Sequence, residues 1–379
     1  MRISLRATLN LIKTSCQSQH LLNVRREGDA KLIAFYLPQF HTIPLNDKSY
    51  GRGFTEWTNV TRAIPHFTGH YQPRLPIDVG FYDLSHDDVM YRQIELAKMY
   101  GLYGFCFYYY WFSGTRLLEK PLFNYLHNKD LDFPFCLSWA NENWSKLWDG
   151  GNKEIIMEQK NNDGDCECFF YDILPFFNDR RYIKISGKPV LMIYQPQLFS
   201  KEEWFNWVSL LRKLAKENGF EDLFLMSRYQ HERERPEDVF LDAFFEFPPR
   251  NIKFKPKTVA FCNPLTSLKV YDMEEYVEKK YWEKTFDFKL FHGVFPSWDS
   301  TARKAYSEGS VFHGLSPEKY RDWLSSCIQL TKSNHHSSER FVFINAWNEW
   351  AEGAHLEPDQ RYGYAYLQAT KEAVEKGCE

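Results

Sequence analysis

From Lys31 onward the chain alternates short apolar runs with longer amphipathic segments. Short runs of β-branched and aromatic residues predict strands, whereas apolar residues at helical spacing predict helices. Eight strands are predicted, at residues 32–37, 103–109, 133–139, 189–194, 223–228, 243–247, 290–295 and 341–347. Helices are predicted at residues 87–100, 117–128, 165–177, 201–218, 273–284, 317–333 and 360–376, with a weaker pattern over 229–242.

This alternation predicts the fold class. Eight strand–helix units in one continuous chain favour an α/β fold with a single (β/α)8 TIM barrel and long loops at the C-terminal face of the strands. A doubly wound open sheet is the alternative, but the segment Gly51-Arg-Gly53 lacks the third glycine of a phosphate-binding turn and opens no helix. We expect one catalytic domain over residues 31–379, preceded by a lead-in over residues 1–30 that is a candidate for disorder.

The eighth predicted strand ends in two glutamates, Glu349 and Glu352. In a helical turn their spacing would place both side chains on one side, about 5–6 Å apart at Cβ. Glycosidic cleavage needs one carboxyl to protonate the departing oxygen and another to stabilise, attack or deprotonate, so we predict that this pair is catalytic. The alternative is that one acid complements a helix dipole while the other pairs with a basic residue.

Barrel enzymes carry their chemistry at the C-terminal ends of the strands and on the loops that follow. Polar and aromatic residues at these ends are therefore candidates for sugar binding. They are Tyr36, Gln39, Glu56, Trp57, Tyr109, Trp111, Trp139, Asn141, Glu142, Asn143, Trp144, Tyr194, Arg228, Glu246, Trp298, Asp299, Trp347, Asn348 and His355. Glu142 is also a rival for one catalytic role, because an Asn-Glu pair at a strand end supplies the acid in many barrel glycosidases; the alternative is an Asx turn with a surface acid.

Composition narrows the choice of partners. The 47 basic and 50 acidic residues are interspersed and give a net charge of −3, so neither nucleic acid nor a membrane surface is predicted to bind. No run approaches the roughly 20 apolar residues of a membrane span. We therefore predict a cytoplasmic protein whose partner is a glycan. Aromatic residues make up 18% of the chain, and many lie beside polar residues at strand ends, where they would line a cleft.

No cofactor or metal is predicted. The eight cysteines lack the spacing of a metal site, and no cluster of His, Cys and Asp has usable spacing. The segment Asp163-Gly-Asp165 could imitate the Asp-x-Asp metal clamp of nucleotide-sugar transferases. It lies at a polar helix start without a preceding apolar strand, so a helix cap is the better interpretation.

Several sequence blocks, in one order, resemble a known family. They are Ala34-Phe-Tyr-Leu-Pro-Gln-Phe-His41, Gly53-Phe-Thr-Glu-Trp-Thr-Asn-Val60, His70-Tyr-Gln-Pro-Arg74, Trp139-Ala-Asn-Glu-Asn-Trp144, Phe295-Pro-Ser-Trp-Asp299 and Asn345-Ala-Trp-Asn-Glu-Trp-Ala-Glu-Gly353. The chain resembles the WbsX-like family from about Lys31 to about Ala373. That family is described as glycosyltransferases of polysaccharide or lipopolysaccharide biosynthesis and is related to glycoside hydrolase family 99, the endo-mannosidases and endo-mannanases.

The resemblance implies a (β/α)8 barrel that acts on glycans without a metal or a nucleotide-sugar fold. In the hydrolase relatives a Glu-x-x-Glu at this strand end acts with retention of configuration. Glu349 matches the acid that deprotonates the sugar 2-hydroxyl, which attacks C1 to give an epoxide-like intermediate, and Glu352 matches the acid/base. Ala351 stands where those hydrolases usually have histidine, which affects the expected mannose contacts but not the carboxylate pair.

The predicted function is a carbohydrate-active enzyme that cleaves or transfers glycosyl groups in a polysaccharide or oligosaccharide through the Glu-x-x-Glu pair. One alternative is a glycosyltransferase of lipopolysaccharide, O-antigen or capsule biosynthesis that uses an activated sugar donor. A second alternative is a glycan-binding barrel without catalytic activity.

Overall fold

The computed structural model describes residues 29–146, 154–230, 234–250, 252, 254–263, 266, 268–304 and 309–377. The predicted lead-in over residues 1–30 therefore lies almost wholly outside the described part of the chain. Within the described residues, no helix combines the length and the apolar character that crossing a bilayer requires.

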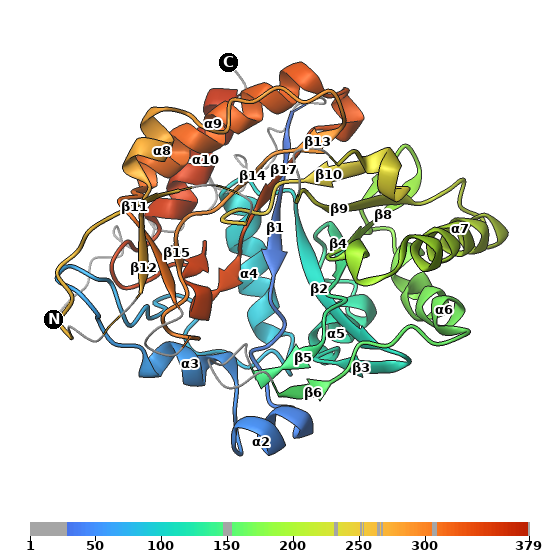
Figure 1. Cartoon of the computed structure of the whole chain (residues 1–379), viewed down its shortest axis with the longest axis horizontal. Coiled ribbons are helices and arrows are strands. Elements are labelled where there is room, and N and C mark those ends of the chain that lie inside the picture. Colours follow the sequence, from blue (N-terminus) through green and yellow to red (C-terminus); the bar gives the residue numbers. More distant parts are fainter. Residues whose placement is uncertain are drawn as a thin grey trace, which may run out of the picture.

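A barrel of parallel strands forms the centre of the molecule (Figure 1). Every neighbouring pair in the barrel sheet is parallel, and the first strand lies beside the last. The predicted (β/α)8 barrel is thus confirmed. Its segments in chain order are β1 (Lys31–Tyr36), β2 (Gly104–Phe112), β4 (Phe135–Trp139), β8 (Lys188–Ile193), β9 (Phe224–Arg228), β10 (Ala243–Phe245), β13 (Leu290–Phe291), β14 (Gly293–Val294) and β17 (Phe341–Ile344).

The barrel closes through its seventh strand, which is split at His292 into β13 and β14. β13 pairs with β10, whereas β14 pairs with β17. The Phe343 N–H donates to the His292 carbonyl oxygen at 2.9 Å, so backbone hydrogen bonding continues across the split. A Cβ on Gly293 would lie 2.1 Å from the carbonyl oxygen of Glu246. The closure therefore requires glycine at this position.

The barrel strands are largely apolar because the packed interior covers one of their faces and the helices cover the other. All nine residues of β2 are buried, as expected for a parallel strand with a packed interior on one side and helices on the other. Inside the barrel, Phe35, Phe245 and Phe343 come from three different strands and pack with ring centroids 5.5–5.9 Å apart. The barrel interior is therefore a packed core rather than a pore.

Helices surround the barrel, with α9 and α10 along one side and α6 and α7 along another (Figure 1). Their ends follow local signals in the sequence. The Ser200 side chain accepts a hydrogen bond from the backbone of Glu203 at 3.3 Å, and the Glu203 carboxylate caps in return. The outer helices are α4 (Asp88–Met99), α5 (Lys120–His127), α6 (Asp165–Phe177), α7 (Lys201–Glu217), α8 (Glu274–Glu278), α9 (Pro317–Asn334) and α10 (Ala365–Gly377).

Two helical predictions are wrong in length. The helix predicted over 273–284 is only α8, because Lys280 adopts a left-handed backbone with φ of 48° that a helix cannot continue. The weak pattern over 229–242 holds the single 3₁₀ turn η3 (Pro236–Val239) and no α-helix among its described residues. The segments after the fifth and sixth barrel strands therefore place little helix against the outside of the barrel.

The loops after the barrel strands carry their own short elements, in agreement with the prediction of long loops at this face. A four-stranded sheet combines segments that follow β10 and β14, in the order β11-β12-β16-β15. The additional elements are α2 (Pro44–Tyr50), α3 (Glu56–Arg62), β3 (Thr115–Leu117), β5 (Trp144–Ser145), β6 (Ile155–Met157), β7 (Lys184–Ile185), η2 (Pro196–Leu198), β11 (Lys255–Pro256), β12 (Lys269–Asp272), β15 (Trp298–Asp299), β16 (Ser310–His313), η4 (Ser337–Glu339), β18 (Asn348–Glu349), η5 (Trp350–Glu352) and β19 (Ala354–His355).

Gly293→Ala should destabilise the barrel at its closure, because the new methyl group would overlap the backbone of β10 and the strand would have to move. Gly187→Ala is the control: Gly187 has open space around it but φ of 76°, so its loss should cost only about 1–2 kcal/mol. Thermal unfolding followed by circular dichroism should show a larger fall in unfolding temperature for Gly293→Ala. Equal falls would contradict the steric argument.

Candidate active site

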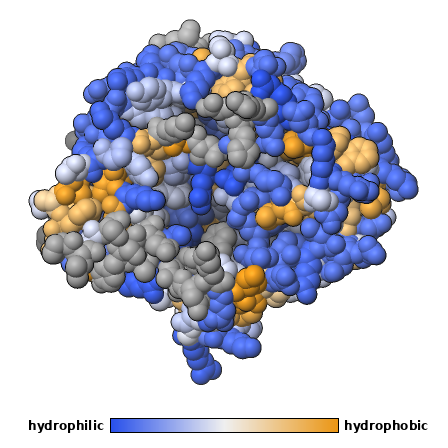
Figure 2. All heavy atoms as spheres, in the orientation of Figure 1, coloured by the Kyte–Doolittle hydropathy of each residue, from blue (hydrophilic) through white to orange (hydrophobic). Residues whose placement is uncertain are grey.

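A cavity of about 660 Å³ opens at the C-terminal ends of the barrel strands. It lies in the hollow at the middle of the face seen in Figure 2, where hydrophilic residues predominate. Its lining comes from the loops after several strands. The lining residues are Tyr108, Tyr110, Ala140, Asn141, Glu142, Asn143, Ser145, Ile155, Gln159, Asn161, Tyr194, Leu198, Phe199, Phe247, Arg250, Trp298, Arg303, Lys304, Glu349 and Glu352.

Both predicted catalytic acids line this cavity. Glu349 ends strand β18 and Glu352 ends the 3₁₀ turn η5, so the segment between them is one tight turn. In such a turn, side chains three residues apart lie on the same side. Gly353 then reverses the chain with φ of 61°, and a Cβ there would lie 2.8 Å from the Asp299 Cβ. The turn is therefore held close to the loop that follows the seventh strand.

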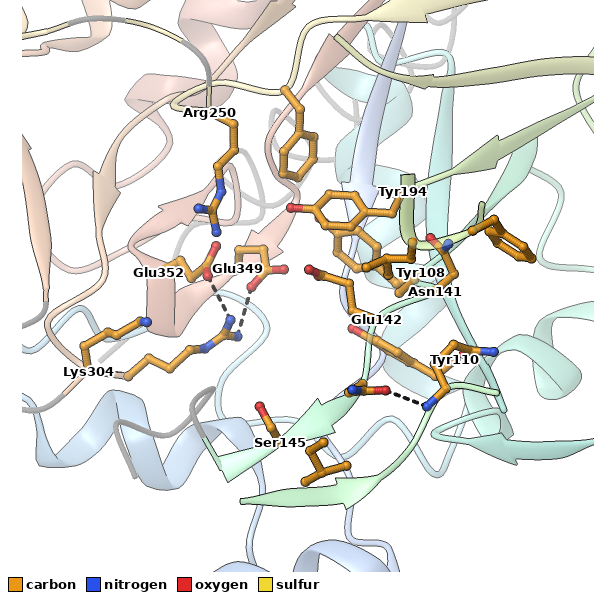
Figure 3. A pocket seen from close by; sticks show the side chains of 18 of the residues that line it. Tyr108, Tyr110, Asn141, Glu142, Ser145, Tyr194, Arg250, Lys304, Glu349 and Glu352 are labelled. Carbon is orange, nitrogen blue, oxygen red and sulfur yellow. Dashed lines mark hydrogen bonds and ion pairs between the residues drawn. The ribbon is translucent and has the colours of Figure 1, made fainter. Parts of the chain in front are cut away.

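One arginine from that loop joins the two acids. Arg303 Nη1 lies 2.9 Å from Glu352 Oε1, and Nη2 lies 3.2 Å from Glu349 Oε2 (dashed in Figure 3). A third carboxylate, that of Glu56 on α3, lies 3.3 Å from Nη2. The Arg303 side chain is 3% exposed, so these charges meet away from bulk water, where attraction between opposite charges is strong. A single guanidinium thus serves three carboxylates.

Burial and the neighbouring acids set the protonation of Glu349. Its burial raises the pKa of Glu349 well above the ordinary value, and the negative charges of Glu352 and Glu56 raise it further. Arg303 acts in the opposite direction but does not cancel these effects. The Glu349 side chain is 6% exposed, whereas that of Glu352 is 19% exposed and reaches into the cavity. The two acids therefore occupy different environments, which is the usual basis for different roles.

A third acid, Glu142, points into the cavity from the opposite wall (Figure 3). It accepts a hydrogen bond from the Gln195 side chain. Asn141 fixes the same loop, because it exchanges two hydrogen bonds of 2.8 Å with the Gln195 backbone. Burial raises the pKa of Glu142, and two nearby arginines oppose the rise. The loop after β4 thus presents a carboxyl in a well-anchored position.

Behind the acid turn, Glu357 organises an aromatic layer. Its carboxylate accepts hydrogen bonds from the indoles of Trp347 (3.0 Å) and Trp350 (2.6 Å), from Gln93 (2.6 Å) and from the Tyr82 hydroxyl (2.9 Å). Burial raises the pKa of Glu357 to about 7, although all four donors oppose the rise. The two tryptophans flank Glu349 in sequence, so this carboxylate fixes the segment on which the acids stand.

Asp299 plays a similar part in the loop that carries Arg303. It is fully buried and accepts hydrogen bonds from His70 (2.7 Å), Gln72 (2.9 Å) and the hydroxyl of Thr301 (2.6 Å). Burial alone would raise the pKa of Asp299, but His70, the charge of Arg74 and the Thr301 hydroxyl hold it below the ordinary value. The carboxylate is therefore a fixed anchor of the loop.

The cavity brings together seven of the predicted site residues. They are Asn141, Glu142, Asn143, Tyr194, Trp298, Glu349 and Glu352. Asn143 accepts a hydrogen bond from the Gln159 backbone at 2.7 Å, and Trp298 donates to Ser310 at 3.1 Å. These residues converge from the loops after the third, fourth, seventh and eighth strands.

The other predicted site residues do not line the cavity. Tyr36, Trp347, Asn348 and His355 belong to the buried layer behind the acid turn, where His355 stacks on Trp350 with ring centroids 3.8 Å apart. Tyr109, Trp111 and Trp139 pack around Phe169 of α6, outside the barrel. The remainder support residues that line the cavity or belong to nearby loops. They are Gln39, Glu56, Trp57, Trp144, Arg228, Glu246 and Asp299.

Strand alternation explains much of this division. Successive side chains of a strand point to opposite faces, so Tyr108 and Tyr110 face the cavity while Tyr109 and Trp111 face the helices. Gln39 lies just outside the cavity and donates a hydrogen bond to the Tyr110 hydroxyl at 3.0 Å. It therefore positions a lining residue.

The predicted site lacks Arg303, Arg250 and two inward-facing tyrosines, Tyr108 and Tyr110. Arg303 lies in an irregular loop, where no periodic pattern marks it. One signal was available: a pair of buried carboxylates requires a compensating cation, which had to come from a loop at the same face of the barrel. Among the described residues, no group of three His, Cys, Asp or Glu side chains could hold a metal ion. The glutamates converge on a guanidinium instead.

A comparison with family profiles shows to which protein family the chain belongs. The profile described as "Glycosyltransferase WbsX" matches residues 32–370, nearly the whole chain. The chain belongs to the WbsX glycosyltransferase family. Membership places it among carbohydrate-active enzymes. Two curated relatives, both called "Uncharacterized protein WxcX", come from two strains of Xanthomonas campestris pv. campestris and are 42% identical over 353 residues. The match covers 91% of this chain, which spans about half the length of these relatives.

Two solved structures share the fold of this chain. A GH99 endo-alpha-mannosidase from Bacteroides thetaiotaomicron superposes with a TM-score of 0.58 at 15% identity, covering 92% of this chain and 97% of that one. A protein described as "Glycoside hydrolase-like protein" gives a TM-score of 0.56 at 14% identity, covering 94% and 99%. At this identity the likeness concerns the barrel fold alone.

Glu349→Gln should stabilise the WbsX-family domain at neutral pH. The folded pKa of Glu349 is raised above its unfolded value, so ionising this carboxyl costs stability above the unfolded pKa of about 4.3. Glutamine removes that cost, and Arg303 keeps its ion pairs with Glu56 and Glu352. The gain in unfolding temperature should therefore be largest near pH 7 and shrink as the pH falls toward 4.

Glu203→Gln is the control of opposite sign. Hydrogen bonds from Ser200 lower the pKa of Glu203, so its carboxylate stabilises the fold above the unfolded pKa and this contribution is lost as the pH falls. Its replacement should lower the unfolding temperature at pH 7. If Glu349→Gln also destabilised the protein at pH 7, the assignment of a raised pKa to a buried Glu349 would be wrong.

Proposed function

We propose that this domain cleaves or transfers glycosyl groups in an oligosaccharide or polysaccharide, with retention of configuration, through Glu349 and Glu352. The observation that carries the proposal is the acid pair itself: two carboxylates on one tight turn, joined by Arg303, in a cavity with aromatic walls. The cavity volume lies within the range of small-molecule sites. Tyr108, Tyr110 and Trp298 offer flat faces against which the apolar side of a sugar ring can pack.

The environments of the two acids suit a division of labour. Glu349, the more buried, takes the proton of the sugar 2-hydroxyl while that oxygen attacks C1. A raised pKa makes its carboxylate a stronger base once ionised. Glu352, the more accessible, gives a proton to the departing oxygen as the glycosidic bond breaks. In the second step Glu352 removes a proton from the incoming water or sugar hydroxyl, and the three-membered ring opens as the 2-oxygen regains its proton from Glu349.

Arg303 supports both acids in this scheme. Its positive charge favours the ionised form of Glu349, the base, and its two terminal nitrogens fix the orientation of both carboxyl groups. Glu56, which does not line the cavity, also pairs with Arg303 and so partly neutralises the guanidinium charge. Arg303 thus holds the two carboxyl groups in one arrangement.

A glycosyltransferase that uses an activated sugar donor is the second candidate. The family description favours it, since the matching profile is named for glycosyltransfer. The same acids would then act on a donor whose leaving group is a phosphate, and an acceptor hydroxyl would replace water. The two candidates differ in the donor and share the cavity.

Glu349→Gln and Glu352→Gln should each lower turnover by at least about 10²-fold, because each removes a group that transfers a proton in the transition state. The assay tests α-mannosides, bacterial polysaccharides, nucleotide sugars and lipid-linked sugars as substrates. NMR identifies the anomer that is released first, which shows whether the configuration is retained. Glu203→Gln on α7 is the matched control and should keep parental turnover. Equal turnover in both acid variants and the parent would sink the proposal, whereas activity only with an activated donor would select the transferase.

Arg303→Gln should move the acidic limb of the pH profile of kcat/KM to higher pH. Arg303 lowers the pKa of Glu349, so its loss raises that pKa and the base is ionised only at higher pH. Arg303→Lys keeps the charge and should leave the limb close to the parental position. Arg321→Gln is the control, because this partly exposed arginine on α9 pairs with Glu372 and does not line the cavity. A limb that stays in place in Arg303→Gln would show that Glu349 does not control it.

A further inference from the structure

Two cationic side chains line the cavity beside Glu352. Arg250 and Lys304 lie on either side of it, and both reach toward the space that the acids enclose (Figure 3). Neither forms an ion pair with any residue that the structure describes. Arg303, in contrast, meets three carboxylates within 3.3 Å. The charge of Arg303 is therefore neutralised within the protein, whereas those of Arg250 and Lys304 are available to a ligand.

The setting of Arg250 supports this availability. Arg250 is exposed to the cavity and lies close to the Tyr194 hydroxyl, with Glu352 and Glu142 as its charged neighbours. The ring of Tyr194 is covered on another side by the guanidinium of Arg228, 4.6 Å from the ring centroid. Two arginines thus bracket one tyrosine at the cavity wall and give that wall a positive character.

Three acids and three basic residues line the cavity. Glu142, Glu349 and Glu352 stand against Arg250, Arg303 and Lys304. Burial favours the protonated form of both Glu142 and Glu349. Arg303 is already matched by three carboxylates, so the positive charge left without an ion pair among the described residues lies on Arg250 and Lys304, on the wall beside Glu352. A neutral sugar would leave this charge without a partner, whereas an anion would complete it.

We propose that the glycan bound here carries an anionic group, a carboxylate or a phosphate, which Arg250 and Lys304 bind beside Glu352. Arginine matches the planar pair of oxygens of either group, and lysine adds a second donor as a point charge. A uronic acid residue and a glycosyl phosphate are two sources of this chemistry. The inference rests on the proposed function, since it concerns the same cavity.

The experiment compares acidic, phosphorylated and neutral sugars of one kind. Isothermal titration calorimetry of the whole chain would use oligomannuronate against manno-oligosaccharide of equal length, and mannose 1-phosphate against mannose. At least one anionic probe should bind about tenfold or more tightly than its neutral partner, the difference expected of a charge-assisted hydrogen bond. This advantage should fall as salt rises.

Arg250→Gln and Lys304→Gln should each reduce the preference for the anionic probe by about fivefold or more, and together they should abolish it. Lys213→Gln, an exposed lysine on α7, removes the same charge far from the cavity and should keep the preference. A preference for oligomannuronate identifies an acidic glycan, and a preference for mannose 1-phosphate identifies an activated donor. Either result supports the inference.

Three results would overturn the inference. Neutral and anionic probes could bind equally, none of the four could bind, or the preference could survive in the double variant. None of these affects the assay of Glu349→Gln and Glu352→Gln, which tests the acid pair separately. Loss of turnover in those variants, together with equal binding of all probes, would keep the glycosyl chemistry and discard the anionic ligand.

Discussion

The interaction on which the site depends is the contact of one buried guanidinium with three carboxylates. Three carboxyl groups in a space largely closed to water need a compensating cation before they can ionise. Arg303 supplies that charge from the loop after the seventh strand, while Glu56 comes from the loop after the first and the acid pair from the loop after the eighth. A single side chain therefore fixes the relative positions of three loops, and the protons held by the acids depend on it.

Around Arg303, the residues that hold the loops in place differ from the residues that line the cavity. Asp299 and Glu357 are buried carboxylates with several donors each, and both hold loop backbone rather than face the cavity. The tryptophans on Glu357 form a rigid layer behind the acid turn. Such fully satisfied polar networks specify one arrangement of their loops, because any displacement leaves a buried polar group without a partner. The positions of the acid turn and of the loop that carries Arg303 are thus fixed by buried residues that do not line the cavity.

The fold was predictable because parallel barrel strands are covered on both faces and so appear as continuous apolar runs. The same continuity concealed the face that each side chain adopts. Strand β2 is apolar in every position, so no alternation separated the inward Tyr110 from the outward Tyr109 and Trp111. Arg303 and Arg250 lie in irregular loops whose course depends on distant contacts. The acid pair was predictable because it directly follows a strong strand signal.

Asn348 shows how late such a site can form. Its side chain bonds both backbone groups of Leu37, at 2.7 and 3.0 Å, and so ties the end of the first strand to the end of the last across 311 residues of sequence. Contacts of this separation are slow to form, since the loop entropy of the whole chain precedes them. During synthesis, the first strand must therefore wait for the last strand before this contact can close the barrel. The cavity would then be completed in a single late event, and a chain released early would lack it altogether.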